Sequence, residues 1–185
     1  MNNYPEYAQI KDKKYKINTD YKIAIKCNEI AESDIPDEER ALAIIYLLFG
    51  DEGLKDNNNW NELSEISTKF LSCGKEVKKS NEEADISFKQ DWGYIQASFF
   101  SDYNIDLTKQ SMHWWMFYDL MCGLTEKCVL NRIRFVRDFD ISQIKDPKEK
   151  EKWIKQKEQV AIKKEKTSEQ KRLDKLFENL IQKGE

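Results

Sequence analysis

The chain has 185 residues, of which 39% are hydrophobic and 35% charged, a composition that suits one ordinary core with a charged extension. Its net charge of −3 is unevenly divided, because residues 1–144 carry 18 Lys and Arg against 25 Asp and Glu, whereas residues 145–185 carry 13 against 9. The acidic body disfavours nucleic acid and anionic membranes as partners, and the mixed charges of the tail do not form a polybasic arm.

The N-terminal residues predict a short β-hairpin followed by a helix. Polar and apolar residues alternate around Asp12 and Lys13, which is typical of two short strands joined by a tight turn. Thr19 or Asp20 can accept hydrogen bonds from first-turn amides, so either can cap a helix that runs through about Ala31. The chain is therefore expected to begin with a small sheet before helices take over.

Two further helices are predicted next, with a loop between them. Pro36 and the acidic residues after it suit the first turn of a helix, whose apolar run stops at Gly50. Residues 51–59 are polar and predict a loop. Asn59 is expected to cap a third helix, which carries one apolar stripe and ends at Gly74.

The stretch from Asp91 to Leu124 is predicted to form the core. It reads as two helices separated by a short extended turn at 104–107, with a solvated connector at 75–85 before them and Gly123 as the stop. Apolar residues cover nearly every side of the second helix, so we expect it to be enclosed all round. The large side chains are Trp92, Ile95, Phe99 and Tyr103 in the first helix, and Trp114, Trp115, Phe117, Tyr118, Leu120 and Met121 in the second.

An arginine-bearing helix is predicted after the aromatic pair, with Thr125 as its cap. Its arginines, Arg132, Arg134 and Arg137, flank Phe135 and could contact phosphates while the ring stacks on bases. In an acidic body, such arginines more often form a solvated face that pairs with local carboxylates. We favour that interpretation over nucleic-acid binding.

The tail predicts a charged, amphipathic helical extension. Asp146, Pro147 and Glu149 have the spacing of a capping box, so a helix begins there. Further on, large apolar residues fall on one face at helical spacing: Leu173, Leu176, Phe177, Leu180 and Ile181. Their full burial would give a gross gain near ~10 kcal/mol before ordering and association costs. The stripe is therefore the predicted partner-binding surface, although it could equally fold back on the bundle or self-associate as a coiled coil.

No group of residues indicates catalysis or a cofactor. His113 is the only histidine, and a zinc site would need further ligands at suitable spacing. On one helix His113 and Cys122 would be about 13 Å apart at ~1.5 Å per residue, too far for a nucleophilic pair. Asp102 and Asp106 bracket a turn, where helix capping outweighs acid-base work. We expect no enzyme activity, no cofactor and no metal, with His113 packed and its ring nitrogens hydrogen-bonded.

Membrane and disulfide chemistry are also disfavoured. The longest apolar run, residues 41–49, is far shorter than the ~20 residues that span a bilayer, and no signal segment follows Met1. The cysteines lack CxxC pairing and are expected to be buried free thiols: Cys27, Cys73, Cys122 and Cys128. A soluble intracellular protein is predicted. Its fold class is mainly α, a helical bundle with an N-terminal β-hairpin in residues 1–144 and the helical extension in residues 145–185.

The order and spacing of several motifs resemble a known family, the phage "gene product fifteen" proteins of Gram-positive siphophages. The start of that family is matched by Tyr15–Tyr21 (YKINTDY). Its central motifs are matched by Asp91–Leu107 and His113–Phe117 (HWWMF), followed by Gly123 and Leu124. The residues taken as the core and family fingerprint are Asp91, Trp92, Phe99, Tyr103, His113, Trp114, Trp115 and Phe117.

The resemblance implies a tail assembly chaperone in the cytoplasm of the bacterial host. Such proteins are thought to coat the tape measure protein, keep it soluble and recruit subunits of the major tail protein. The resemblance implies no catalytic residues and does not say which surface binds the tape measure. A structural or adaptor protein of the virion is the alternative, and a helical nucleic-acid-binding regulator is a further one.

Overall fold

The computed structural model describes residues 4–76 and 85–163. Within them the chain forms a two-stranded antiparallel sheet and seven α-helices, which confirms the predicted mainly-α class with an N-terminal hairpin. The elements are β1 (Tyr7–Ile10), β2 (Lys13–Lys16), α1 (Tyr21–Ala31), α2 (Asp37–Lys55), η1 (Asn57–Asn59), α3 (Trp60–Leu71), α4 (Phe88–Tyr103), α5 (Trp114–Cys122), α6 (Val129–Asp138), η2 (Ile141–Gln143) and α7 (Pro147–Val160).

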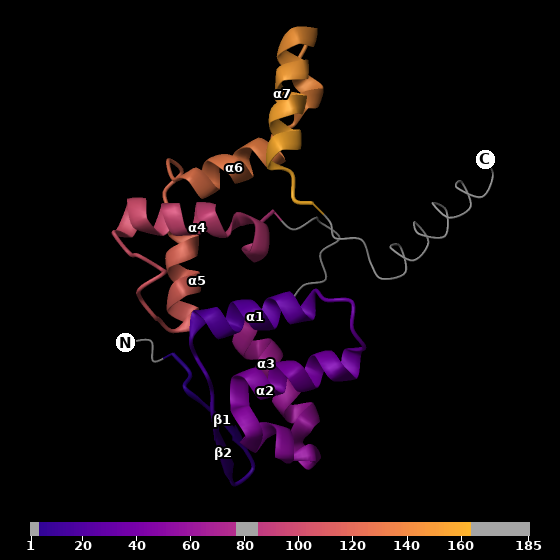
Figure 1. Cartoon of the computed structure of the whole chain (residues 1–185), viewed down its shortest axis with the longest axis vertical. Coiled ribbons are helices and arrows are strands. Elements are labelled where there is room, and N and C mark those ends of the chain that lie inside the picture. Colours follow the sequence, from indigo (N-terminus) through magenta and orange to yellow (C-terminus); the bar gives the residue numbers. More distant parts are fainter. Residues whose placement is uncertain (1–3, 77–84, 164–185) are drawn as a thin grey trace, which may run out of the picture.

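The helices form two neighbouring groups (Figure 1). In the first, α1, α2 and α3 pack together and the hairpin lies against α2. In the second, α4 packs on α5 and α6, while α7 stands at the far end of the molecule and contacts α6 (Figure 1). Contacts of α1 with both α4 and α5 join the groups, so α1 lies between them.

The hairpin and α1 follow local sequence rules. Ala8 pairs with Tyr15 across the hairpin, and the turn falls at Lys11 and Asp12, one position earlier than the sequence predicts. Lys11 takes a positive φ of 50°, which allows the tight turn. Asp20 caps α1 as one of the two predicted candidates, since its carboxylate accepts from the Lys22 N–H at 2.7 Å.

The predicted loop at 51–59 is wrong, because α2 continues past Gly50 to Lys55 and η1 follows. Gly50 has a φ of 65° and a ψ of −158°, which are not helical, so the regular helix stops there as predicted and a second helical segment follows across a kink. Gly53 then packs against α2 itself, where an added Cβ would lie 2.6 Å from the Phe49 Cβ. This close contact packs the two segments of α2 together across the kink at Gly50.

The boundaries of α3 also differ from those predicted. Asn59 precedes α3 without capping it through its side chain, which instead donates to Tyr15 and Asp56, each at 3.1 Å. The helix ends at Leu71, and Gly74, with a φ of 71°, closes the following turn through a 2.8 Å hydrogen bond to Lys69 O.

The core lies where the two aromatic helices meet α1. Phe99 and Phe117 are fully buried, and Trp114 is 2% exposed. The expectation that α5 is enclosed all round is wrong, because Met116 is 43% exposed. A nine-residue helix at one edge of the bundle buries one face, and hydrophobic composition alone does not bring neighbours to the other.

The start of α6 is set by a contact with α4. Thr125 does not cap the helix as predicted, since its N–H and hydroxyl both donate to Asp102, at 2.8 and 2.9 Å. Cys128 caps α6 instead, with its sulfur accepting from the Asn131 N–H at 3.4 Å. Asp102 therefore joins the end of α4 to the turn before α6, and these bonds lower the pKa of its carboxyl group.

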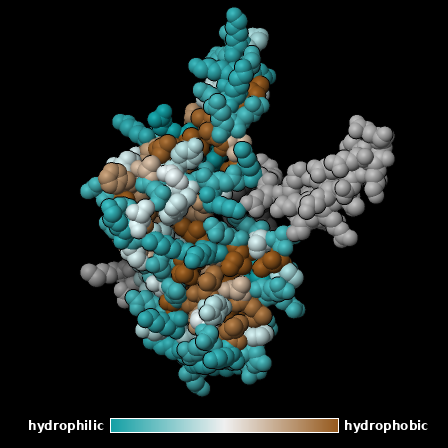
Figure 2. Space-filling view, viewed as in Figure 1, coloured by the Kyte–Doolittle hydropathy of each residue, from teal (hydrophilic) through white to brown (hydrophobic). Residues whose placement is uncertain are grey.

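Helix α7 begins where the sequence predicts, and an aromatic contact attaches it to the loop before it. Asp146 accepts from the Lys148 N–H at 2.8 Å, with Pro147 in the first turn. No residue of α7 is buried, but Trp153 stacks on Phe139 of the preceding loop at 4.0 Å. Figure 2 shows mostly hydrophilic residues on this helix. Across the described part of the chain, no helix has both the length and the apolar content needed to cross a bilayer.

The cysteines are free, as predicted, but they are not all buried. Cys27 and Cys128 are buried, and burial raises the pKa of the Cys27 thiol to about 12. Cys122, the last residue of α5, is exposed, which corrects the prediction.

Candidate functional site

The Tyr15–Tyr21 motif and the His113–Phe117 motif at the start of α5 lie side by side. The Trp114 N–H donates to Thr19 O at 2.7 Å, and the Tyr21 N–H donates to Met112 O at 3.1 Å. Asp20 pairs with residue 113 as an isolated antiparallel bridge. We call this contact, formed by residues 18–21 and 111–114, the motif junction. The Ser111 hydroxyl also donates to Asp20 at 2.5 Å. The junction therefore joins two segments that lie about ninety residues apart in the sequence.

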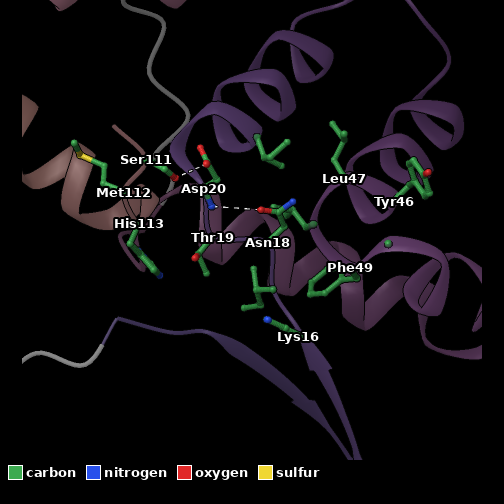
Figure 3. Close-up of a pocket in the computed structure, with 14 residues that line it drawn as sticks. Lys16, Asn18, Thr19, Asp20, Tyr46, Leu47, Phe49, Ser111, Met112 and His113 are labelled. Atoms are coloured by element: carbon green, nitrogen blue, oxygen red, sulfur yellow. Dashed lines mark hydrogen bonds between the residues drawn. The ribbon is translucent and has the colours of Figure 1, made fainter. Parts of the chain in front are cut away.

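A groove opens beside the motif junction (Figure 3). It has a volume of about 870 Å³ and lies between the junction, the end of β2 and the middle of α2. Its floor is anchored by a backbone hydrogen bond of 2.7 Å from the Asn18 N–H to Leu48 O. The lining residues of this junction groove are Lys16, Ile17, Asn18, Thr19, Asp20, Ile23, Tyr46, Leu47, Leu48, Phe49, Gly50, Ser111, Met112 and His113.

The junction groove has a polar wall and an apolar wall. In Figure 3, Asp20 and Ser111 lie on one side, and Tyr46 and Leu47 project from α2 on the other. Tyr46 is 50% exposed although it is a large hydrophobic residue. Figure 2 shows hydrophobic residues gathered over the face that carries α1 and α2, the two helices that line the groove. A groove of this kind suits the side chains of a protein partner.

His113 lines the groove, and both of its ring nitrogens are hydrogen-bonded. Its Nδ1 accepts from the Trp115 N–H at 3.1 Å and caps α5, so the proton is on Nε2, which donates to Pro5 O at 3.0 Å. Tyr4 stacks on the ring at 5.0 Å. The predicted packing with satisfied ring nitrogens is confirmed. In residues 4–76 and 85–163, no group of three or more His, Cys, Asp or Glu side chains is placed to hold a metal ion.

A stack of aromatic rings backs the motif junction. Phe117 lies between Tyr21 and Phe99, with ring centroids 4.8 and 4.9 Å away and planes within 6° and 11° of parallel. The Tyr21 hydroxyl donates to Leu107 O at 2.6 Å, and burial raises its pKa to about 12. Trp92 stacks on the other side of Tyr21 at 6.3 Å. The stack therefore fixes the start of α1 against α4 and α5.

The remaining fingerprint residues connect α5 to its neighbours. The indole N–H of Trp114 donates to Leu71 O at 3.0 Å, and that of Trp115 donates to Phe70 O at 2.9 Å. Both bonds satisfy carbonyl groups at the end of α3. The Tyr103 hydroxyl donates to Leu120 O at 2.9 Å, which fastens α4 to α5.

Asp91 and Arg137 form a buried ion pair away from the groove. Both guanidinium contacts measure 2.7 Å, and the side chains are 1% and 12% exposed. Arg134 pairs with Asp85 at the surface. Pairing of the α6 arginines with local carboxylates is thus confirmed for these two residues, but a solvated face describes Arg134 and not Arg137. The Arg137 side chain is shielded from water because it lies under the end of α7, where its guanidinium donates to Val160 O at 2.6 Å.

The sequence analysis recognised the two motifs but neither their contact nor the groove beside them. Asn18 and Asp20 lie inside the first motif, and Ser111 and Met112 directly precede the second, so proximity to the motifs was an available signal. Tyr46 carries no such signal, because it sits in a continuous apolar run. The predicted partner-binding residues, Leu173, Leu176, Phe177, Leu180 and Ile181, lie outside the described residues.

Comparison with known proteins gives one match. A family model described as "Bacteriophage Gp15 protein" matches residues 2–162, which include the hairpin, both motifs of the junction and every helix from α1 to α7. No curated protein and no solved structure matches the chain. The family match covers most of the 185 residues. The chain therefore belongs to the bacteriophage Gp15 protein family.

Proposed function

We propose that this protein is a tail assembly chaperone of a Gram-positive siphophage, which acts by binding other proteins and not by catalysis. Its partners are the tape measure protein and the major tail protein, and it acts in the cytoplasm of the bacterial host. Two observations support this: membership of a phage family and the junction groove with its exposed apolar wall. The groove is the observation that carries the proposal, since it provides a surface for a partner.

The chemistry of the groove matches that of an amphipathic helix. A tape measure protein is a very long helical chain, and its apolar stripes would aggregate if they were left bare. Tyr46, Leu47 and Met112 offer apolar contact to such a stripe, while Asp20 and Ser111 offer hydrogen bonds to the polar residues beside it. Each copy would cover a short part of the filament.

A second contact is proposed through the tail stripe. Leu173, Leu176, Phe177, Leu180 and Ile181 would cover more of the same apolar surface from another side. Two modest contacts on one chain bind more tightly than either alone when both can be engaged together. The tail therefore increases the affinity that the groove provides.

Co-expression with the protein encoded immediately downstream tests the proposal. If that neighbour is a long helical protein that precipitates alone, this chain should keep it soluble and be pulled down with it. Precipitation in the presence of this chain would overturn the proposal. A chaperone also leaves the finished particle, so stoichiometric presence of the chain in purified virions, measured by mass spectrometry, would favour a structural or adaptor protein instead.

Matched variants separate the two proposed contacts. Tyr46→Asp charges the apolar wall and should reduce capture of the neighbour, whereas Phe100→Asp should not, because Phe100 is a 59% exposed aromatic on α4 outside the groove. Leu176→Asp with Leu180→Asp should abolish the tail contact and leave the core folded. Unchanged circular dichroism and thermal midpoints show that each variant is folded. Equal capture by Tyr46→Asp and wild type would remove the groove from the proposal.

A further inference from the structure

A second, smaller groove lies between α1 and the start of α4. Its volume is about 310 Å³, and it has no residue in common with the junction groove. We call it the basic groove, because its lining has three lysines and one glutamate. The lining residues are Lys22, Ile25, Lys26, Glu29, Phe88, Lys89 and Trp92.

The floor of the basic groove is apolar and firmly backed. Ile25 is 8% exposed. Trp92 stacks on Tyr21 at 6.3 Å, and Phe88 packs edge-on against Trp114 at 5.9 Å. Since these partners belong to the aromatic core, the floor keeps its shape when the groove is empty, and an apolar side chain can enter without rearranging it.

The rim attracts negative charge. Lys22 and Lys26 are exposed on successive turns of α1, and neither forms an ion pair with the described residues. The Lys22 ammonium lies 5.7 Å from the centre of the Tyr21 ring. A ligand for this groove therefore combines an apolar group with carboxylates on either side of it.

The chain itself carries such a group in the turn between α1 and α2. Ile35 is 37% exposed, and residues 33–39 contain four acidic residues without any Lys or Arg, with Asp37 paired to the following Arg40. Glu38 and Glu39 are exposed in the first turn of α2. We call residues 33–39 the acidic turn. Its composition is complementary to the basic groove in both apolar and charged character.

The acidic turn does not line the groove of its own chain. It leads from α1 into α2, whereas the basic groove is formed by α1 and α4. Figure 1 shows α2 and α4 on opposite sides of α1. The two features do not meet within this chain, so each can be met by the complementary surface of a second copy.

We propose that the acidic turn of one copy docks in the basic groove of a second copy, with Ile35 on the apolar floor and the carboxylates beside Lys22 and Lys26. Every copy carries both surfaces, so the contact is self-complementary and can be made reciprocally within a dimer. Its charged rim is exposed, and salt therefore weakens it. The contact needs no tape measure protein and does not depend on the function proposed above.

Charge reversal on each side tests this pairing by sedimentation velocity. Wild type should associate with rising concentration at low salt and dissociate as salt is added. Lys22→Glu with Lys26→Glu, or Glu38→Lys with Glu39→Lys, should each weaken self-association by about tenfold or more, because like charges then face each other. An equimolar mixture of the two double variants should associate again, since each reversed surface finds its opposite.

The apolar contact has its own matched control. Ile35→Ser should weaken association, whereas Ile154→Ser should not, because Ile154 is 38% exposed on α7 and lies outside the groove and the turn. These single changes are at the surface and keep the fold, as circular dichroism will show. A wild type that stays monomeric at low salt would overturn the proposal. So would a mixture of charge-reversed variants that stays dissociated, or equal association of both serine variants.

Discussion

Asp91 and Arg137 meet as a bidentate ion pair that joins the first turn of α4 to the last turn of α6, with both N to O distances at 2.7 Å. The Asp91 carboxylate also accepts from the Ser87 N–H at 2.9 Å, and Arg137 donates to Asp85 O and Val160 O. One guanidinium group therefore holds α4, α6 and the end of α7 together.

Asp91→Asn should lower the free energy of unfolding by about 3–5 kcal/mol, because it leaves a buried arginine without its counter-charge. Urea unfolding followed by circular dichroism measures the loss. Asp85→Asn is the control, since it breaks the exposed pair with Arg134 and should cost about 0–1 kcal/mol. Similar losses in both variants would show that burial does not set the strength of these pairs.

Phe117→Ala should destabilise the fold by about 3–5 kcal/mol, because the ring is fully buried between Tyr21 and Phe99 and its removal leaves a cavity. Met116→Ala, one residue earlier and 43% exposed, should change stability by less than about 0.5 kcal/mol. Denaturant midpoints at constant slope provide the comparison. A large effect at Met116 would mean that this face of α5 is covered in solution.

Asp56 should contribute a pH-dependent part of the stability. Hydrogen bonds from Lys13, Tyr15 and Asn59 lower its pKa from 3.8 to about 2. Because the folded pKa lies below the unfolded one, the contribution is present above about pH 4 and is lost as pH falls towards 2. The measurement is the difference in unfolding free energy between wild type and Asp56→Asn across that range. A difference that stays constant with pH would contradict the prediction.

Binding to nucleic acid should be absent even at low salt. Arg134 and Arg137 already engage Asp85 and Asp91, so phosphates would have to displace protein carboxylates. Fluorescence anisotropy with a labelled duplex tests this. Affinity that falls linearly with the logarithm of salt concentration would instead indicate phosphate contacts and a regulator.

Local rules predicted the parts of the fold that depend on neighbouring residues. Asp20 and Asp146 cap helices because their carboxylates reach amides two residues away, and that geometry is readable from sequence. Thr125 shows the limit of such rules, because Asp102 on another helix takes its donors. Gly50 breaks the helix as its sequence position predicts, but the residues after it form a further helical segment and not the expected loop.

The candidate site depends on contacts that sequence patterns do not contain. The motifs around Asp20 and His113 were each recognisable, but their pairing requires the whole arrangement of α1, α4 and α5. Tyr46 reaches the groove only because α2 packs beside the junction. The spacing of apolar residues along one segment shows which face of a helix is apolar. It does not show whether a distant segment covers that face or leaves it exposed.

The motif junction sets the time during synthesis at which the junction groove is complete. The hairpin and α1 to α3 lie within the first 71 residues, and these contain the apolar wall of the groove. The opposite wall includes Ser111, so a nascent chain lacks it until more than a hundred residues have left the ribosome. Translation proceeds at about 5–20 residues per second, so several seconds pass between synthesis of the apolar wall and synthesis of the wall that contains Ser111. The complete groove therefore exists only when most of the chain has been translated.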